Sequence, residues 1–173
     1  MRMALVLGLV AAAVLSTAQA ADRKIDDFYG RWVGTGQATQ GTAVTQSRDS
    51  EVVFEKAADG FKVSWTTMSS NVNEASKSKV KASEITFKRG KKPGVFVDVK
   101  SGSATEGKKT TWARLSGDTL SIIQLVMADD GQWDVTQYDR TLKGNDAMTL
   151  NFTRVSNAAI ARQASLQMTR AKD

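Results

Sequence analysis

The fold of this chain is indicated most clearly by residues 143–153, which read KGNDAMTLNFT. The first three of these residues form a candidate turn, since glycine and asparagine tolerate the positive φ angles that tight turns require. After the turn, Met148, Leu150 and Phe152 alternate with polar residues, so their side chains point to one face of an extended segment. The stretch therefore predicts a turn followed by a half-buried β-strand.

The same period of two recurs along the chain from Phe28 onward. It predicts about nine or ten strands, near residues 31–39, 50–56, 60–68, 78–88, 94–100, 109–115, 119–127, 132–142, 147–155 and 164–170. Turn-forming clusters lie between many of these segments, at 58–60, 89–91, 116–118, 129–131 and 143–145. The longest expected loop is 69–77, and a short helical turn is expected over 157–163.

The number of strands favours a closed architecture. An open antiparallel sheet of this size has two long edges, and the sequence offers no amphipathic helix to cover a face. Closing the sheet removes both edges. We therefore predict an all-β fold, a single antiparallel up-and-down β-barrel of about 8–10 strands with a short helical turn near the C-terminus.

The first twenty residues have the pattern of a secretory signal peptide. Arg2 precedes the apolar run 3–15, and small residues then lead to Ala18-Gln19-Ala20, after which we expect cleavage. Residues 21–173 are enough for one hydrophobic core, so a single β-barrel domain is expected. The expected location is periplasmic or secreted, and the absence of cysteine argues against a lipoprotein.

The composition excludes several common catalytic mechanisms and metal sites. The chain contains no histidine and no cysteine, so Ser–His and Cys–His nucleophiles are absent, as are zinc, haem or copper sites built on nitrogen or sulfur ligands. We expect no catalytic residues, no cofactor and no metal, and hence a protein that is not an enzyme. The formal net charge of +6 favours anionic partners without specifying one. Nucleic acid is not expected for an exported chain, and the oligomeric state is left open.

Ten aromatic, aliphatic and methionine side chains are predicted to alternate inward and to line the barrel as candidate ligand-binding residues. They are Phe61, Val63, Trp65, Trp133, Val135, Met148, Leu150, Phe152, Leu166 and Met168. About eight strands enclose a space that side chains just fill, whereas ten leave room for one small apolar ligand. A solid core and a ligand pocket therefore both remain open.

Two sets of basic residues have alternative interpretations. Three strands end in a similar way, at 137–140, 151–154 and 167–170, each with a final arginine. Either the aliphatic stem of each arginine continues the inward face while its head reaches the rim, or the arginines form a shared anion-binding rim. Lysines at 77, 79 and 81 and basic residues at 88–92 could form a lip that weakly contacts an anionic envelope surface. The favoured interpretation is that they discourage edge-to-edge aggregation.

The Gly30-Arg31-Trp32 motif resembles the start of the first strand in lipocalins and other calycin barrels. The resemblance implies that Trp32 closes the barrel floor and that an arginine from a late strand packs across it. We expect Arg154 to form this barrel-closing pair, with Arg170 as the alternative. A ten-stranded relative similar to the nitrobindin type fits the strand count equally well, but its haem chemistry cannot apply here because histidine is absent.

The resulting functional prediction is an exported lipocalin-like barrel that binds or carries a small hydrophobic or amphipathic ligand. The alternative is a protein-binding barrel with a filled core, because the chain also resembles periplasmic protease inhibitors of this shape. In those inhibitors the inhibitory strength lies in an amino-terminal trunk, which corresponds here to residues 21–27.

Overall fold

The computed structural model describes residues 23–40 and 43–172, so the expected signal peptide lies outside the described residues. Ten strands and two short 3-10 helices make up the fold. In chain order they are η1 (Ile25–Phe28), β1 (Gly30–Gln40), β2 (Ala43–Ala57), β3 (Gly60–Asn71), β4 (Glu74–Arg89), β5 (Val95–Asp98), η2 (Ala104–Glu106), β6 (Thr110–Ser116), β7 (Thr119–Met127), β8 (Trp133–Leu142), β9 (Ala147–Ser156) and β10 (Ala159–Arg170).

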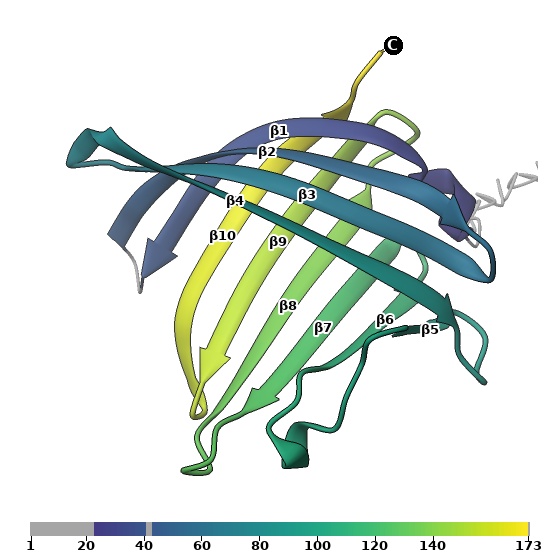
Figure 1. Cartoon of the computed structure of the whole chain (residues 1–173). Coiled ribbons are helices and arrows are strands. Elements are labelled where there is room, and N and C mark those ends of the chain that lie inside the picture. The colour runs from purple at the N-terminus through teal and green to yellow at the C-terminus, as the bar shows by residue number, and fades with distance from the viewer. Residues whose placement is uncertain (1–22, 41–42, 173) are drawn as a thin grey trace, which may run out of the picture.

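Each strand pairs antiparallel with its neighbours in sequence, and β1 also pairs with β10, which closes the barrel (Figure 1). The prediction of an all-β, antiparallel up-and-down barrel is confirmed, and the ten-stranded barrel is calycin-like. Over the ranges that the structure describes, neither helix is long and apolar enough to cross a membrane.

Two local predictions near the hairpin turns are wrong. The expected helical turn over 157–163 is a tight turn at Asn157 and Ala158, both with positive φ, followed at once by β10. Pairing with β9 extends this strand over residues 159–162, which have no strong strand pattern of their own, and pairing with β1 follows from Gln163 onward. Similarly, the loop expected over 69–77 consists only of Val72 and Asn73, because β3 and β4 continue pairing almost to the turn.

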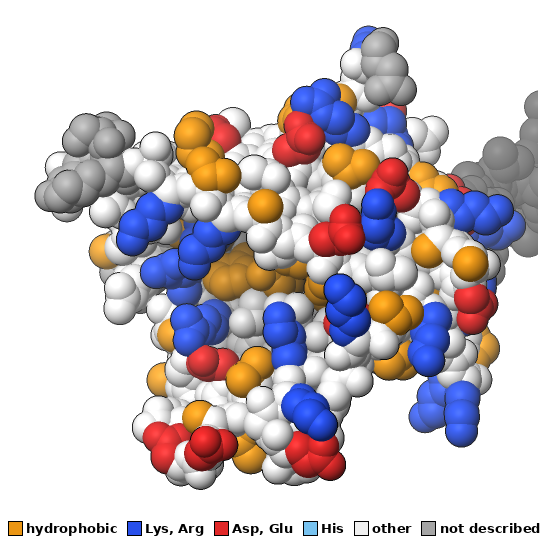
Figure 2. All heavy atoms as spheres, viewed as in Figure 1, with side chains coloured by type: hydrophobic (Ala, Val, Ile, Leu, Met, Phe, Trp, Pro, Cys, Tyr) orange, Lys and Arg blue, Asp and Glu red, His pale blue; other side chains and the backbone are white. Residues whose placement is uncertain are grey.

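The barrel is closed unevenly along its length. The β4–β5 pairing covers only residues 87–89 and 96–98, so most of β4 pairs on one side only, with β3. Figure 2 shows a hollow on this side, next to β4, with a hydrophobic floor and several Lys and Arg side chains around it. We call the part of the barrel near the β3–β4, β7–β8 and β9–β10 turns the open half.

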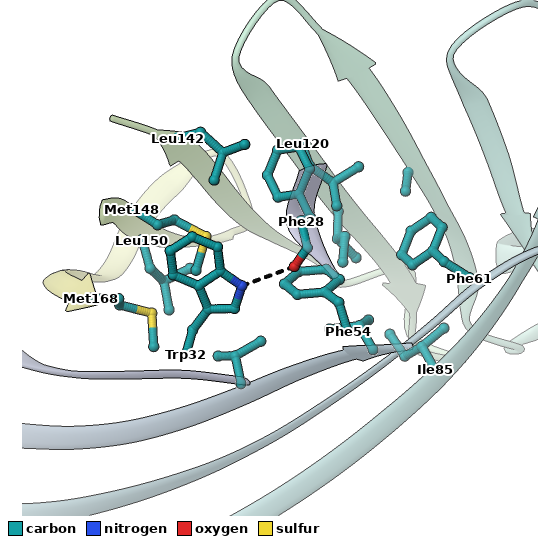
Figure 3. Packing of buried hydrophobic residues seen from close by; sticks show 14 of the residues in the cluster. Phe28, Trp32, Phe54, Phe61, Ile85, Leu120, Leu142, Met148, Leu150 and Met168 are labelled. Carbon is teal, nitrogen blue, oxygen red and sulfur yellow. Dashed lines mark hydrogen bonds between the residues drawn. The ribbon is translucent and has the colours of Figure 1, made fainter. Parts of the chain in front are cut away.

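The opposite part, the closed end, is filled by the amino-terminal segment and large apolar side chains. Ile25 and Phe28 of η1 are buried, and the Trp32 indole nitrogen donates a hydrogen bond of 2.9 Å to the Phe28 carbonyl (Figure 3). Phe61 stacks on Phe87 with ring centroids 4.8 Å apart. The closed end therefore has a packed core rather than a pocket.

The segment that leads into the barrel is part of this closed end. Arg23 forms an ion pair of 3.0 Å with Asp118 in the β6–β7 turn, and Ile25 is only 4% exposed. The resemblance to protease inhibitors implied a trunk over residues 21–27. From residue 23 onward, this segment instead lies against the barrel.

Arg170 completes the closed end. Its guanidinium carbon lies 4.2 Å from the centroid of the Trp32 ring. Its nitrogens donate hydrogen bonds to the carbonyl oxygens of Asp27 (2.8 Å), Tyr29 and Asn145 (3.0 Å). Trp32 and Arg170 are direct partners in the β1–β10 register. The alternative assignment, Arg170, is therefore the barrel-closing arginine.

Arg154 does not pack against Trp32, so our first assignment is wrong. Arg154 pairs instead with Asp134 at 2.7 Å. In the register it lies opposite Thr136 on β8 and Arg162 on β10, toward the open half. The two arginines lie at opposite ends of the barrel because β9 and β10 run antiparallel.

Candidate functional site

The sequence-predicted lining residues fall into three groups. Six of them, Phe61, Val63, Met148, Leu150, Leu166 and Met168, are at most 6% exposed and belong to the packed core. Trp65 and Phe152 also point inward but are only partly buried. The third group, Trp133 and Val135, is on the outer face of the barrel.

The expectation that Trp133 and Val135 face the interior is wrong, because the alternation of inward and outward side chains along β8 is shifted by one residue from the predicted one. On β8, Tyr138 lies opposite Phe152 and Arg140 lies opposite Leu150, so the even-numbered side chains point inward. Apolar residues occur at both inward and outward positions of this strand, and the charged Arg140 is at a buried inward position. The sequence pattern therefore did not show which face is inward. The outward Trp133 and Val135 lie beside Met127 and Leu125 of β7, which cover part of their surface.

An aromatic cluster marks the boundary between the packed core and the open half. Tyr138 lies between Trp65 and Phe152, with ring centroids 5.3 and 5.2 Å away. All three rings point inward, and all three are partly exposed. Aromatic rings at such spacings attract one another and present large flat apolar surfaces. The open half therefore has an aromatic floor that the protein does not cover completely.

Arg140 lies next to this cluster and is 0% exposed. Its guanidinium carbon is 5.7 Å from the ring centroid of Phe54 and 5.4 Å from those of Trp65 and Tyr138. None of its three side-chain nitrogens has a hydrogen-bond partner. Burial lowers the pKa of Arg140 to about 10, so its side chain is still charged at neutral pH.

The three rings do not fully compensate this buried charge. Three desolvated cation–π contacts, at about 2 kcal/mol each, are comparable to the several kcal/mol that burying an ion costs after relaxation, so the remaining deficit lies in the unmade hydrogen bonds. Each hydrogen bond left unmade adds a further penalty, and a guanidinium has five N–H donors. Arg140 is thus a buried cation whose donors are not satisfied by the described part of the chain.

Two further arginines point into the open half. Arg48 on β2 lies with its guanidinium carbon 5.5 Å from the Phe152 ring centroid, and its buried Nε atom has no partner. Burial, and next the charge of Arg162, lowers the pKa of Arg48. Arg162 lies opposite Arg154 in the register and is exposed. The open half therefore carries an excess of positive charge.

Arg154 does not add to this excess. Asp134 accepts hydrogen bonds from Arg154 and from the Ser156 hydroxyl, and these two bonds lower the pKa of Asp134. The pair is partly exposed and electrically neutral as a unit. The three strand-ending arginines therefore have three different surroundings, and the interpretation of a shared anion-binding rim is wrong.

The expected basic lip also divides into separate groups. Lys79 and Lys81 are opposite Ser69 and Thr67, in the inward phase of β4, and both are exposed near the open half. Lys91 and Lys92 lie beyond the other end of β4, in the turn that leads to β5. The side chain of Lys77 lies outside the described residues.

A groove on the outer surface is the main alternative location for a ligand. Its volume is about 790 Å³, and it spans β1, β2, β9 and β10. Most of its lining comes from outward-facing polar side chains such as Thr35, Gln37 and Asn151. Its lining includes Phe152 and Arg48, but it contains neither the other two rings of the aromatic cluster nor the buried Arg140.

The sequence analysis did not place Arg48, Tyr138 and Arg162 at the site, and it considered Arg140 only as one of the three strand-ending arginines. One signal for two of them was present. The segments 137–140 and 151–154 share a spacing in which an aromatic residue precedes an arginine by two positions. If Phe152 points inward, the same spacing places Tyr138 and Arg140 inward as well.

Comparisons with known proteins identify the fold and not a family. No protein-family model matches the chain, and no curated protein sequence matches it. Among solved structures, it is similar to the S-type phycobiliprotein lyase CPES from Guillardia theta, with a TM-score of 0.58 and 9% identity over 86% of this chain and 90% of that chain. It is also similar to Rv2717c from M. tuberculosis, with a TM-score of 0.51 and 13% identity over 85% of this chain and 94% of that chain. At these identities the likeness concerns the fold alone.

Proposed function

We propose that this protein is an exported barrel that binds a small amphipathic molecule in its open half. The observation that carries the proposal is the inward-facing cluster of Trp65, Tyr138 and Phe152, whose rings are left partly exposed. Ligand sites in proteins are typically concave and aromatic, with a few well-placed polar groups. Export rests on the sequence of residues 1–20, and it is part of the proposal.

Binding is favoured over catalysis by the residue types at the site. The open half brings together aromatic rings and arginines, which recognise and hold a molecule. The alternative of a protein-binding barrel with a filled core has less support, because the packed core stops at the aromatic cluster. The amino-terminal lead is also held at the closed end through Arg23 and Ile25.

Calorimetric titration with ten-carbon amphiphiles tests the proposal. We expect decanoate or 1-decanol to bind the purified protein with one site. Trp65→Leu should weaken this binding about tenfold, because the loss of a ring contact removes on the order of 1 kcal/mol. Trp133→Leu, on the outer face, is the matched control and should leave binding unchanged. Absence of binding, or an equal loss in both variants, would contradict the proposal.

A further inference from the structure

Arg140 is a buried charged side chain with which no carboxylate of the described residues forms an ion pair, and the charges of Tyr138 and Asp139 only partly offset the effect of its burial. It is completely buried, its Nε and both Nη atoms lack hydrogen-bond partners, and it forms no ion pair. Buried charges in proteins are nearly always paired or hydrogen-bonded, because an uncompensated one is strongly unfavourable. Three aromatic rings surround it, but rings offer no acceptor for a planar fork of N–H donors.

The neighbouring charges increase the attraction for an anion. Arg48 and Arg162 both belong to the inward phase, and neither forms an ion pair with an acidic side chain of the described residues. The nearby inward carboxylate, Asp134, is already occupied by Arg154 and Ser156. A negative group that enters the open half therefore meets several uncompensated cations and little repulsion.

We propose that Arg140, supported by Arg48 and Arg162, forms an anion-recognition site, and that the ligand is an amphipathic organic anion. This inference rests on the proposed function and specifies its ligand class. A guanidinium fork matches a carboxylate or a phosphate through two parallel hydrogen bonds, so either can serve as the head group.

The arrangement of the site also sets the orientation of the ligand. Tyr138 is one inward position nearer to the open half than Arg140, and Trp65 packs against both. An apolar tail placed against Arg140 would leave its donors unsatisfied. The ligand therefore binds with its head inward at Arg140 and its tail along Trp65 and Phe152 toward the opening. Because Arg140 is fully covered, the Trp65 or Tyr138 ring rotates to admit the head group.

The test compares three ligands that share a ten-carbon tail, namely decanoate, decyl phosphate and the neutral 1-decanol. Isothermal titration of the purified protein should show at least about tenfold tighter binding of one or both anions than of the alcohol. In Arg140→Met this preference should fall to within about twofold, while affinity for 1-decanol stays the same. Arg114→Met is the matched control, since Arg114 is exposed on the outer face of β6 and its loss changes the net charge equally.

The outcomes separate the two proposals. If all three ligands bind equally well and Arg140→Met changes nothing, the anion site is wrong and the binding barrel stands. If none of them binds, both are wrong. Preference for decanoate alone assigns a carboxylate head group, and preference for decyl phosphate alone assigns a phosphate ester. Loss of preference in Arg114→Met as well would show a nonspecific charge effect and overturn the site.

A second measurement does not depend on the folding of the Arg140 variant. The ring centroid of Trp65 lies 5.4 Å from the Arg140 guanidinium carbon, so the ring must shift or change its surroundings when an anion enters. Whichever of decanoate and decyl phosphate binds more tightly should therefore change the tryptophan fluorescence of the unmodified protein, and this change should disappear in Trp65→Phe. An unchanged signal in Trp65→Phe would show that other tryptophans report the binding and would contradict entry at Arg140.

Discussion

The closed end and the open half each contain an inward-facing arginine beside aromatic rings, but only one of the two is satisfied by the fold. Arg170 lies over Trp32 and donates to three backbone carbonyls. Arg140 has three rings around it and no acceptor. Both arginines occur at equivalent positions in similar strand segments. The difference shows that the same local pattern stabilises the fold at one end and leaves a charge for a ligand at the other.

The largest effect is expected at the floor of the closed end. Trp32→Ala should lower the free energy of unfolding by about 3–5 kcal/mol, because it removes a fully buried ring and leaves a cavity. Trp65→Ala should cost only about 1–2 kcal/mol, since its ring is partly exposed. Urea denaturation followed by circular dichroism measures both. Equal losses would contradict the distinction between a packed end and an open half.

The next largest loss of stability is expected from the removal of Arg170, whose hydrogen-bond donors have acceptors in the fold. Arg170→Met should lower the free energy of unfolding by about 2–3 kcal/mol, because charge-assisted hydrogen bonds to carbonyls and a cation–π contact are lost. The control is Arg154→Met, whose ion pair with Asp134 is partly exposed and contributes at most about 1 kcal/mol. Chemical denaturation of the two variants under identical conditions would reveal whether they differ in this order.

Arg140→Met should not lower the free energy of unfolding, in contrast to Arg170→Met. Replacing an unpaired buried charge by an apolar side chain of similar length is neutral or stabilising, by up to about 1–4 kcal/mol. We therefore expect the midpoint of thermal unfolding to stay or rise in the ligand-free protein. A decrease comparable to that of Arg170→Met would show that Arg140 contributes to stability rather than to recognition.

The smallest effect concerns the ionisation of Tyr138. Burial raises its pKa, and the charges of Arg140 and Arg48 partly oppose this rise. The chain has two tyrosines, so Tyr29→Phe leaves Tyr138 as the only one to titrate by absorbance. Its pKa should lie above 10, and it should rise further in the additional Arg140→Met background. A lower pKa in that background would contradict the proximity of the two side chains.

The same ionisation has a consequence for stability. The folded protein retains the Tyr138 proton at a pH where the unfolded chain has lost it. Stability therefore falls as the pH rises above about 10. Bound decanoate should raise the pKa of Tyr138 as well, because it neutralises the positive charge that favours the phenolate.

Much of the fold could be predicted from the sequence, because the alternation of side chains is a local property. Met148, Leu150 and Phe152 show their phase without knowledge of any other strand. The phase of β8 could not be obtained in this way, since Trp133 and Val135 have the pattern of an inward face and Arg140 does not. Pairing with β7 and β9 decides the phase, and that pairing depends on the closed sheet.

The candidate site was less predictable, for a different physical reason. Arg48 and Arg162 are far apart in sequence, and they influence one another only because β1 brings β2 and β10 together. Whether an arginine is satisfied depends on acceptors that the fold places around it. Arg170 meets carbonyls of the η1 segment at the closed end, and the local sequence does not show that Arg140 meets no such acceptors.

The most direct test of the central claim is a crystal structure of the protein grown with decanoate or decyl phosphate, whichever binds more tightly. We predict that the oxygens of its head group lie about 2.7–2.9 Å from the Arg140 nitrogens, with the tail against Trp65 and Phe152. The same amphiphile bound in the outer groove of β1, β2, β9 and β10, with Arg140 still unpartnered beneath the aromatic cluster, would contradict it.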